Sequence, residues 1–129
     1  MRYLLIIPLL LFACQESPTA TSEPVLGKPF TLKVGESVAF DNSDLVITFA
    51  GVLDDSRCAQ NVLCVWQGNA EMQFSLIGDM TFLLNSFLDN HETLVSDYLV
   101  TFVNLQPQTY TQKSIDPQSY VVELVITEQ

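Results

Sequence analysis

The 129-residue sequence has few basic residues and few of the side chains from which metal and catalytic sites are usually built. Five Lys and Arg stand against 15 Asp and Glu, for a formal net charge of −10. So negative a chain repels phosphate backbones and anionic lipid headgroups, and we expect no nucleic-acid partner. His91 is the only histidine, and a histidine without a second His or Cys nearby is typical of an exposed side chain rather than a zinc ligand.

Patterns typical of helical, membrane-spanning or hydrolytic proteins are also missing. No 3.6-residue apolar period continues for three turns, and neither a G-x-S-x-G sequence nor a D-x-D-x-D-G calcium loop is present. The longest apolar run is Leu4 to Phe12, which is well short of the roughly 20 residues that a helix needs to cross a bilayer. We therefore expect neither a membrane-spanning helix nor a familiar catalytic constellation.

What the N-terminus does contain is a short positive start, an apolar run and then Leu11-Phe12-Ala13-Cys14. This ending resembles the bacterial lipoprotein box, so residues 1–13 are predicted to be a lipoprotein signal peptide and Cys14 the lipidated first residue of the mature chain. The alternative is an ordinary signal peptide with a chance cysteine. Gln15 stands where inner-membrane lipoproteins carry Asp, and the resemblance therefore implies the outer membrane of a bacterial cell envelope. Losing Arg2 would leave four basic residues against 15 acidic ones, a charge of −11.

Two segments follow in the predicted mature chain. Residues 14–29 begin with Cys14 and continue with a stretch rich in Pro, Thr, Ser and Glu, a composition that predicts a flexible tether. Residues 30–129 are predicted to form a single β domain, because their apolar side chains recur with a period of two.

The β pattern recurs in several short segments. We expect strands within residues 30–34, 38–40, 45–53, 70–76, 80–84, 98–105 and 120–127. The first two read as short strands or a hairpin, Gly51 predicts a bulge or a close backbone approach, and residues 85–97 read as polar and irregular. Seven or eight strands with turns between them predict an all-β fold, an antiparallel β-sandwich or a partly closed barrel.

The cysteines support export. Three cysteines are an odd number, but removing the predicted lipidated Cys14 leaves the pair Cys58 and Cys64. A disulfide between them is the leading interpretation in an oxidising compartment, and closing so small a ring would stabilise the fold by roughly 2–3 kcal/mol. A metal site or a redox motif is the alternative, although a lone C-x5-C is weak for zinc and redox motifs prefer two intervening residues.

The residues around these cysteines predict a structural clasp. Arg57 follows Asp54 and Asp55 closely enough to form an ion pair. Trp66 follows Cys64 by two positions, so on a strand both face one side, and the indole is predicted to pack on the disulfide in the core; an exposed binding anchor is the alternative. Gly68 predicts a bulge or a place that a side chain covers. The clasp is therefore expected to comprise Asp54, Asp55, Arg57, Trp66 and Gly68.

The same stretch carries a resemblance to a known group of proteins. The motif DSRC-x5-C-x-W-x-G-x-A, which runs from Asp55 to Ala70, resembles one found in small secreted or lipid-anchored bacterial proteins of unassigned function. Ala59 stands here where that group usually has Pro, and Gln67 also departs from its pattern. The resemblance implies a β domain with one disulfide, and it brings no activity, substrate or cofactor.

The sequence as a whole favours a lipid-anchored, non-catalytic β-sandwich of the cell envelope that binds or displays through the loops at one end. Its partner, a protein or a cation, is not specified, and we expect no cofactor. Two alternatives stay open. One is an envelope enzyme that uses Asp54, Asp55 or His91, and the other is a calcium-dependent module that uses the two aspartates. Adjacent residues of a strand point to opposite faces, which argues against joint chemistry by Asp54 and Asp55.

Overall fold

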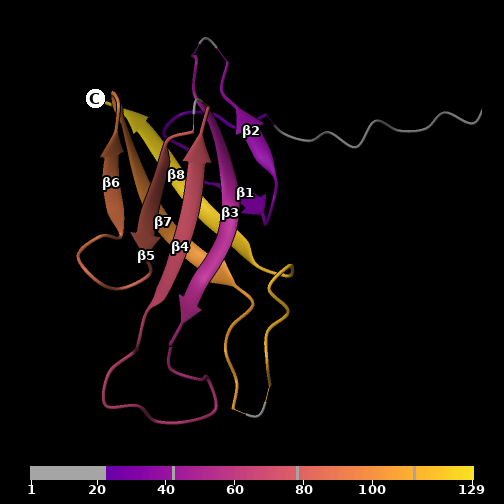
Figure 1. Ribbon diagram of the computed structural model, residues 1–129. Coiled ribbons are helices and arrows are strands. Elements are labelled where there is room, and N and C mark those ends of the chain that lie inside the picture. The colour runs from indigo at the N-terminus through magenta and orange to yellow at the C-terminus, as the bar shows by residue number, and fades with distance from the viewer. Residues whose placement is uncertain (1–22, 42, 78, 112) are drawn as a thin grey trace, which may run out of the picture.

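Two four-stranded sheets face each other in the computed structural model, which describes residues 23–129 apart from 42, 78 and 112 (Figure 1). The predicted signal peptide and Cys14 lie outside the described residues. The first sheet has the order β1 (Phe30–Lys33), β8 (Val121–Glu128), β7 (Tyr98–Gln106) and β6 (Glu92–Val95). The second has the order β2 (Ser37–Ala39), β3 (Val46–Asp55), β4 (Ala70–Leu76) and β5 (Thr81–Asn85). All neighbouring strands are antiparallel, so the predicted all-β sandwich is confirmed, and the sheets do not close into a barrel.

The core between the sheets follows the alternation seen in the sequence. Phe49, Phe74 and Phe82 are register partners across β3, β4 and β5. Their rings stack with centroids 5.2 Å apart in both pairs, a geometry that adds to the gain from burying apolar area. On the other sheet, alternate residues of β8 from Val122 to Ile126 are fully buried, while the residues between them are partly exposed.

The chain changes sheets between β1 and β2. Both predicted short strands exist, but β1 pairs with β8 and β2 pairs with β3, so the predicted hairpin is wrong. A period of two identifies a strand without naming its partner, because the same alternation suits either sheet. Gly35 has a φ of +81° at this crossing, and its N–H donates to the carbonyl of Phe49 at 2.7 Å.

Of two further sequence predictions, the one at Gly51 is confirmed and the one for residues 85–97 is not. Phe49 pairs with Phe74 and Gly51 with Gln73, so the register shifts between them and the bulge predicted at Gly51 is confirmed. Residues 85–97, predicted to be irregular, contain the edge strand β6. Its four residues sit between polar turns, and so short a strand leaves little periodicity to detect.

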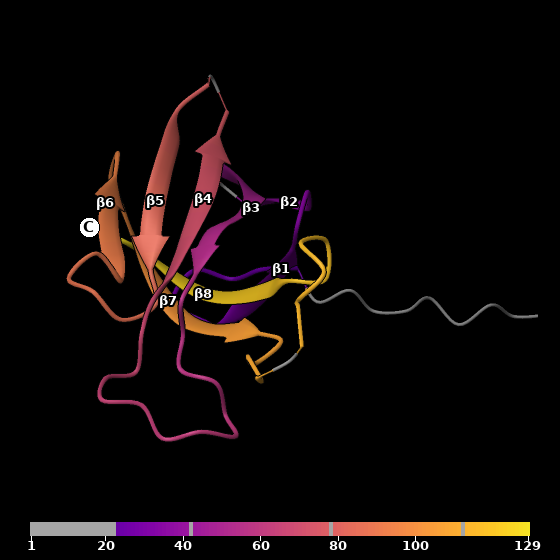
Figure 2. The same cartoon turned by 60° about the horizontal axis from the view of Figure 1, so that its bottom comes forward.

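The two ends of the sandwich differ. The connections β3–β4, β5–β6 and β7–β8 gather at one end, which we call the loop end, and Figure 2 brings it toward the viewer. The chain enters at the opposite end, where Gly27 N–H donates to the carbonyl of Ile126 at 2.7 Å and Leu26 packs against the core. The folded part therefore begins a few residues before the predicted boundary at residue 30. Among the described residues, no helix has the length and apolarity to span a bilayer.

Candidate functional site

The β3–β4 connection, residues 56–69, extends well beyond the sheets at the loop end, and we call it the disulfide loop (Figure 2). Cys58 and Cys64 are bonded, with Cα atoms 6.0 Å apart, which confirms the predicted disulfide. Ser56 N–H donates to the carbonyl of Asn69 at 2.7 Å and Cys58 N–H to that of Gln67 at 2.8 Å. These bonds carry the strand pairing into the base of the loop, and the cysteine ring closes its far part.

Arg57 joins the two sheets at the base of this loop. Its Nε and Nη2 donate to the two carboxylate oxygens of Asp55 at 2.8 and 2.7 Å. Toward the other sheet, Nη1 donates to the carbonyl of Leu105 at 2.9 Å and Nη2 to that of Pro107 at 2.9 Å. Tyr120 completes the group, because its hydroxyl donates to Asp55 Oδ2 at 2.8 Å. We call Asp55, Arg57 and Tyr120 the Arg57 bridge.

The Arg57 bridge changes the acidity of two of its members. Burial raises the pKa of Asp55, but hydrogen bonds from Arg57 and Tyr120 and the positive charge of Arg57 outweigh it, so the pKa lies below its usual value. Burial, followed by the hydrogen bond to the Asp55 carboxylate and its charge, raises the pKa of Tyr120 to about 12. The carboxylate therefore stays ionised and the phenol stays protonated at neutral pH, as a structural ion pair requires.

The structure separates the two aspartates. Asp55 belongs to the Arg57 bridge, whereas Asp54 is exposed and forms no ion pair among the described residues. His91 is exposed in the β5–β6 connection. Within residues 23–129, gaps excepted, no three His, Cys, Asp or Glu side chains lie close enough together to hold a metal ion. Of the acids predicted to form the clasp, only Asp55 contacts Arg57.

Gly68 allows the two arms of the disulfide loop to approach. Its φ is +71°, and a Cβ built there would lie 1.9 Å from the carbonyl oxygen of Ser56 and 2.8 Å from the Cα of Arg57. No side chain fits in that space. The sequence predicted a bulge or a covering side chain at this position, but the group that lies over it is the backbone of Ser56 and Arg57.

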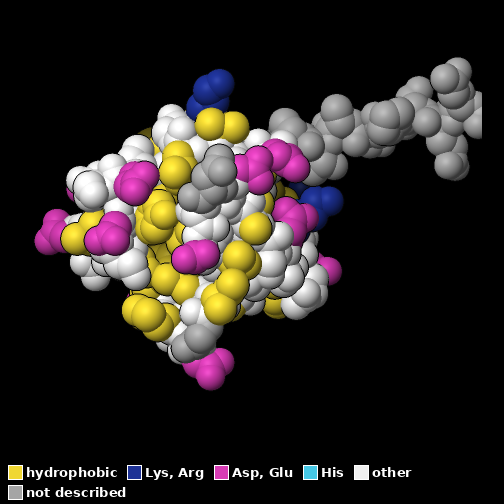
Figure 3. Space-filling view, turned by 90° about the horizontal axis from the view of Figure 1, so that it is seen from above, with side chains coloured by type: hydrophobic (Ala, Val, Ile, Leu, Met, Phe, Trp, Pro, Cys, Tyr) yellow, Lys and Arg dark blue, Asp and Glu magenta, His cyan; other side chains and the backbone are white. Residues whose placement is uncertain are grey.

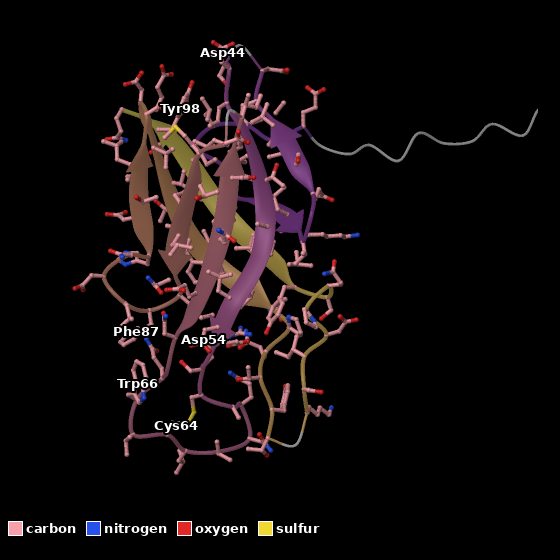
Figure 4. All side chains as sticks on the ribbon, in the orientation of Figure 1. Asp44, Asp54, Cys64, Trp66, Phe87 and Tyr98 are labelled. Carbon is pink, nitrogen blue, oxygen red and sulfur yellow. A yellow bond between two sulfur atoms is a disulfide. The ribbon has the colours of Figure 1, made fainter. Side chains whose placement is uncertain are left out.

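Trp66 does not pack in the core, so the prediction that its indole lies buried on the disulfide is wrong. The side chain is 51% exposed and lies against Phe87, with ring centroids 6.3 Å apart (Figure 4). The prediction assumed a strand from Cys64 to Trp66, but these residues lie in a loop, where the alternation of faces does not apply. The alternative of an exposed anchor fits the observed position.

The β7–β8 connection supports one side of the disulfide loop. Thr109 Oγ1 donates to the carbonyls of Arg57 and Cys58 at 3.2 and 3.1 Å, and Gln60 N–H donates to the carbonyl of Thr109 at 2.8 Å. Farther along, Thr111 N–H donates to Asn61 Oδ1 at 2.9 Å. The β7–β8 connection therefore holds the first half of the loop backbone, from Arg57 to Asn61.

The β5–β6 connection supports the other side through a buried amide pair that the sequence did not reveal. Asn69 Nδ2 donates to Asn85 Oδ1 at 2.8 Å, and Asn69 Oδ1 accepts from the N–H of Phe87 at 3.1 Å. Both asparagines are buried. Asn69 lies within the quoted motif, but its partners are 16 and 18 residues away, and nothing local identifies them.

These supports hold a set of exposed apolar side chains at the loop end. Leu63 and Val65 are fully exposed, at 103% and 105%, on either side of Cys64. The stretch from Cys58 to Ala70 contains no charged residue, in a chain with a net charge of −10. We call this set the apolar tip; it comprises Val62, Leu63, Val65, Trp66, Phe87 and Leu88.

Beside the apolar tip lies an open hollow of about 450 Å³. It is bounded by the disulfide loop, by Ser86 and Phe87 after β5, and by the last part of β7 together with Gln108. Among the residues that the structure describes, Arg57 is the only charged one in its lining, and the guanidinium is already engaged in the Arg57 bridge.

Comparison with known proteins finds no relative: no family model matches the chain, and no match was found among the curated proteins or the solved structures.

Proposed function

We propose that this protein is a lipid-anchored, non-catalytic binding module of the bacterial cell envelope, held in the outer membrane through Cys14, and that it binds a protein partner with its apolar tip. The observation that carries the binding role is the tip itself, a set of exposed apolar side chains on a loop whose base is hydrogen-bonded and whose far part is closed by a disulfide. Leu63 and Val65 cover no part of the core, since both are fully exposed. Exposed apolar clusters of this kind are typical of interaction sites.

The composition of the apolar tip suits a protein interface. The centres of such interfaces are poor in charged residues and rich in aromatic ones, and Trp is among the commonest residues with a large energetic effect. Trp66 and Phe87 contact each other, so neither ring needs to be ordered when a partner binds. Because the disulfide and the neighbouring connections already fix the loop backbone, the entropy cost of binding is reduced.

The position of the apolar tip suits display. Gly27, near the first described residues, is bonded to Ile126, which pairs with Val100 toward the end of the sandwich opposite the disulfide loop. An anchor on the N-terminal side of this point would hold that far end toward the membrane. The apolar tip would then face away from the bilayer, which favours a protein partner over insertion into the anchoring leaflet.

Charge restricts the choice of partner further. Viewed from the end opposite the disulfide loop, Asp and Glu side chains are spread across the surface and Lys and Arg are few (Figure 3). A strongly acidic partner would be repelled by the chain as a whole. We therefore expect a partner whose contact surface is apolar and whose net charge is neutral or positive.

The binding role is tested by a photo-crosslinking amino acid placed at Leu63 in the cell, with the same substitution at Asp44 as the control. Asp44 is exposed at the opposite end (Figure 4). A discrete crosslinked protein from the Leu63 position only, lost when Val65→Ser is added, supports the proposal. Identical crosslinking patterns from both positions would overturn it.

The anchoring is tested separately. Mass spectrometry of the membrane-extracted protein should find an acylated Cys14 at the mature N-terminus, and Cys14→Ser should release the protein from the outer-membrane fraction. An unmodified Cys14 in membrane-extracted protein would contradict the lipid anchor while leaving the apolar tip untouched.

A further inference from the structure

The hollow beside the apolar tip has the size and the walls of a ligand site. Pockets for small ligands commonly enclose about 300–1,000 Å³ and combine aromatic surface with a few polar groups, and this hollow measures about 450 Å³. It lies between the disulfide loop and β7, so its two walls belong to different sheets. Arg57, which lines the hollow, joins the two sheets through its bonds to Asp55 and Leu105.

Carboxamide side chains dominate the polar part of the lining. Gln60 Nε2 donates to Gln108 Oε1 at 3.2 Å, which leaves Gln60 Oε1 and Gln108 Nε2 without partners among the described residues. A carboxamide both donates and accepts, and a hydroxyl group needs both functions from its neighbours. The carboxamide residues that line the hollow are Gln60, Gln67, Asn104 and Gln108.

Aromatic residues supply the apolar part. Phe87 and Phe102 both line the hollow, and Phe87 is half-exposed and contacts Trp66 at its rim. The C–H face of a pyranose ring packs on an aromatic ring, while its hydroxyls reach the surrounding amides. Rings and amides together therefore match a hydroxyl-rich ligand better than a purely apolar one.

The charge of the lining selects an uncharged ligand. No Asp, Glu, Lys or His of the described part of the chain lines the hollow, and four of the five Arg57 N–H groups are already donated to Asp55, Leu105 and Pro107. A cationic ligand would find no acidic side chain there, and an anionic one would find only Arg57, whose charge is paired with Asp55, while also facing the net charge of −10. From this lining we infer that the hollow binds a neutral oligosaccharide. The inference goes beyond the proposed protein-binding role of the apolar tip and does not depend on it.

The experiment is a calorimetric titration of the purified protein with cellotetraose, chitotetraose, maltotetraose and, as an anionic comparison, tetragalacturonate. We expect saturable binding of at least one neutral tetrasaccharide and none of the galacturonate. Because Trp66 is the only Trp and contacts a residue of the lining, its fluorescence should change over the same concentration range.

Two variants test the location. Ala59→Trp fills the hollow, since Ala59 lines it, and Gln60→Ala removes an amide from it; each should weaken binding about tenfold or more, which corresponds to ~1.4 kcal/mol. Gln73→Ala, which removes an amide from strand β4 away from the hollow, is the matched control and should bind as before. Unchanged melting temperature and an intact disulfide show that each variant is folded.

The outcomes are distinct from those of the crosslinking experiment. The oligosaccharide inference is overturned if no neutral tetrasaccharide binds to folded protein, if the two variants bind as tightly as the control, or if Ala59→Trp abolishes only the Leu63 crosslink to a protein. The last result would assign the hollow to the protein partner and leave the proposed function standing.

Discussion

Replacing Arg57 by Met tests how strongly the Arg57 bridge holds the two sheets together. The substitution keeps an apolar side chain of similar length but removes donors to both Asp55 oxygens and to the carbonyls of Leu105 and Pro107. Only 11% of the Arg57 side chain and 10% of the Asp55 side chain are exposed, and removing one partner of such a buried pair costs about 3–5 kcal/mol. We expect the free energy of unfolding to fall by about 4 kcal/mol at pH 7, measured by urea denaturation.

The pH dependence of this loss identifies its cause. The pKa of Asp55 is lowered in the folded protein, so its stabilising contribution is present above the unfolded value of about 3.9 and is lost as the pH falls through the folded-state value. In acid, the wild type has already lost the ion pair. The difference between wild type and Arg57→Met should therefore shrink as the pH is lowered below about 4.

An exposed basic residue supplies the control. Lys33 on β1 is exposed, and Lys33→Met should change stability by no more than about 0.5 kcal/mol. The reasoning fails if Arg57→Met costs no more than this control. It also fails if its cost is the same at pH 7 and in acid, because the loss would then come from packing of the side-chain stem.

Three further predictions concern Gly68, Tyr120 and the disulfide. Gly68→Ala should lower the free energy of unfolding by about 3 kcal/mol or more, because the added Cβ would meet backbone atoms. The control is Gly27→Ala, which has a similar φ but open space around it and should cost only about 1 kcal/mol. Equal losses in urea denaturation would contradict the steric argument. Tyr120→Phe should lower the free energy of unfolding by about 2 kcal/mol. Because the pKa of Tyr120 is raised to about 12 in the folded protein, the stabilisation by its hydroxyl should be fully present below the ordinary pKa near 10 and disappear as the pH rises through about 12. An absorbance titration that shows every tyrosine ionising near pH 10 would disprove the raised pKa. Changing both Cys58 and Cys64 to Ser should cost about 2–3 kcal/mol, since the bond closes a ring with a separation of six residues, and a thermal melt identical to that of the wild type would refute this.

Local patterns in the sequence predicted most of the strands, while features that depend on distant partners were not predictable. The period of two along β4 and β8 identified both strands and their buried faces, because burial of alternate residues is a property of one segment. The pairing of β1 with β8 depends on residues 88 to 94 positions away, and no local signal encodes it. For the same reason the sequence placed Tyr120 in the last expected strand without revealing its bond to Asp55, 65 residues earlier.

The disulfide loop shows the same limit within a single motif. The pairing of Cys58 with Cys64 followed from counting cysteines, and the unusual backbone at Gly68 followed from the residue type. The position of Trp66 depended on whether the loop was extended, and an uncharged stretch that contains Val, Leu and Trp reads equally well as a buried strand or as an exposed tip. The contacts that distinguish an exposed tip from a buried strand come from distant residues, namely Asn85, which bonds to Asn69, and Thr109.

The placement of the first described residues and the disulfide loop at opposite ends has a mechanical consequence. A pull between these two points acts along the strands, while the hydrogen bonds that join β1 to β8 run across them. The bonds of this ladder would then share the load and fail together, instead of opening one after another as in a zipper. With the proposed anchor at one end and the proposed partner at the other, tension would therefore load the β1–β8 ladder in shear.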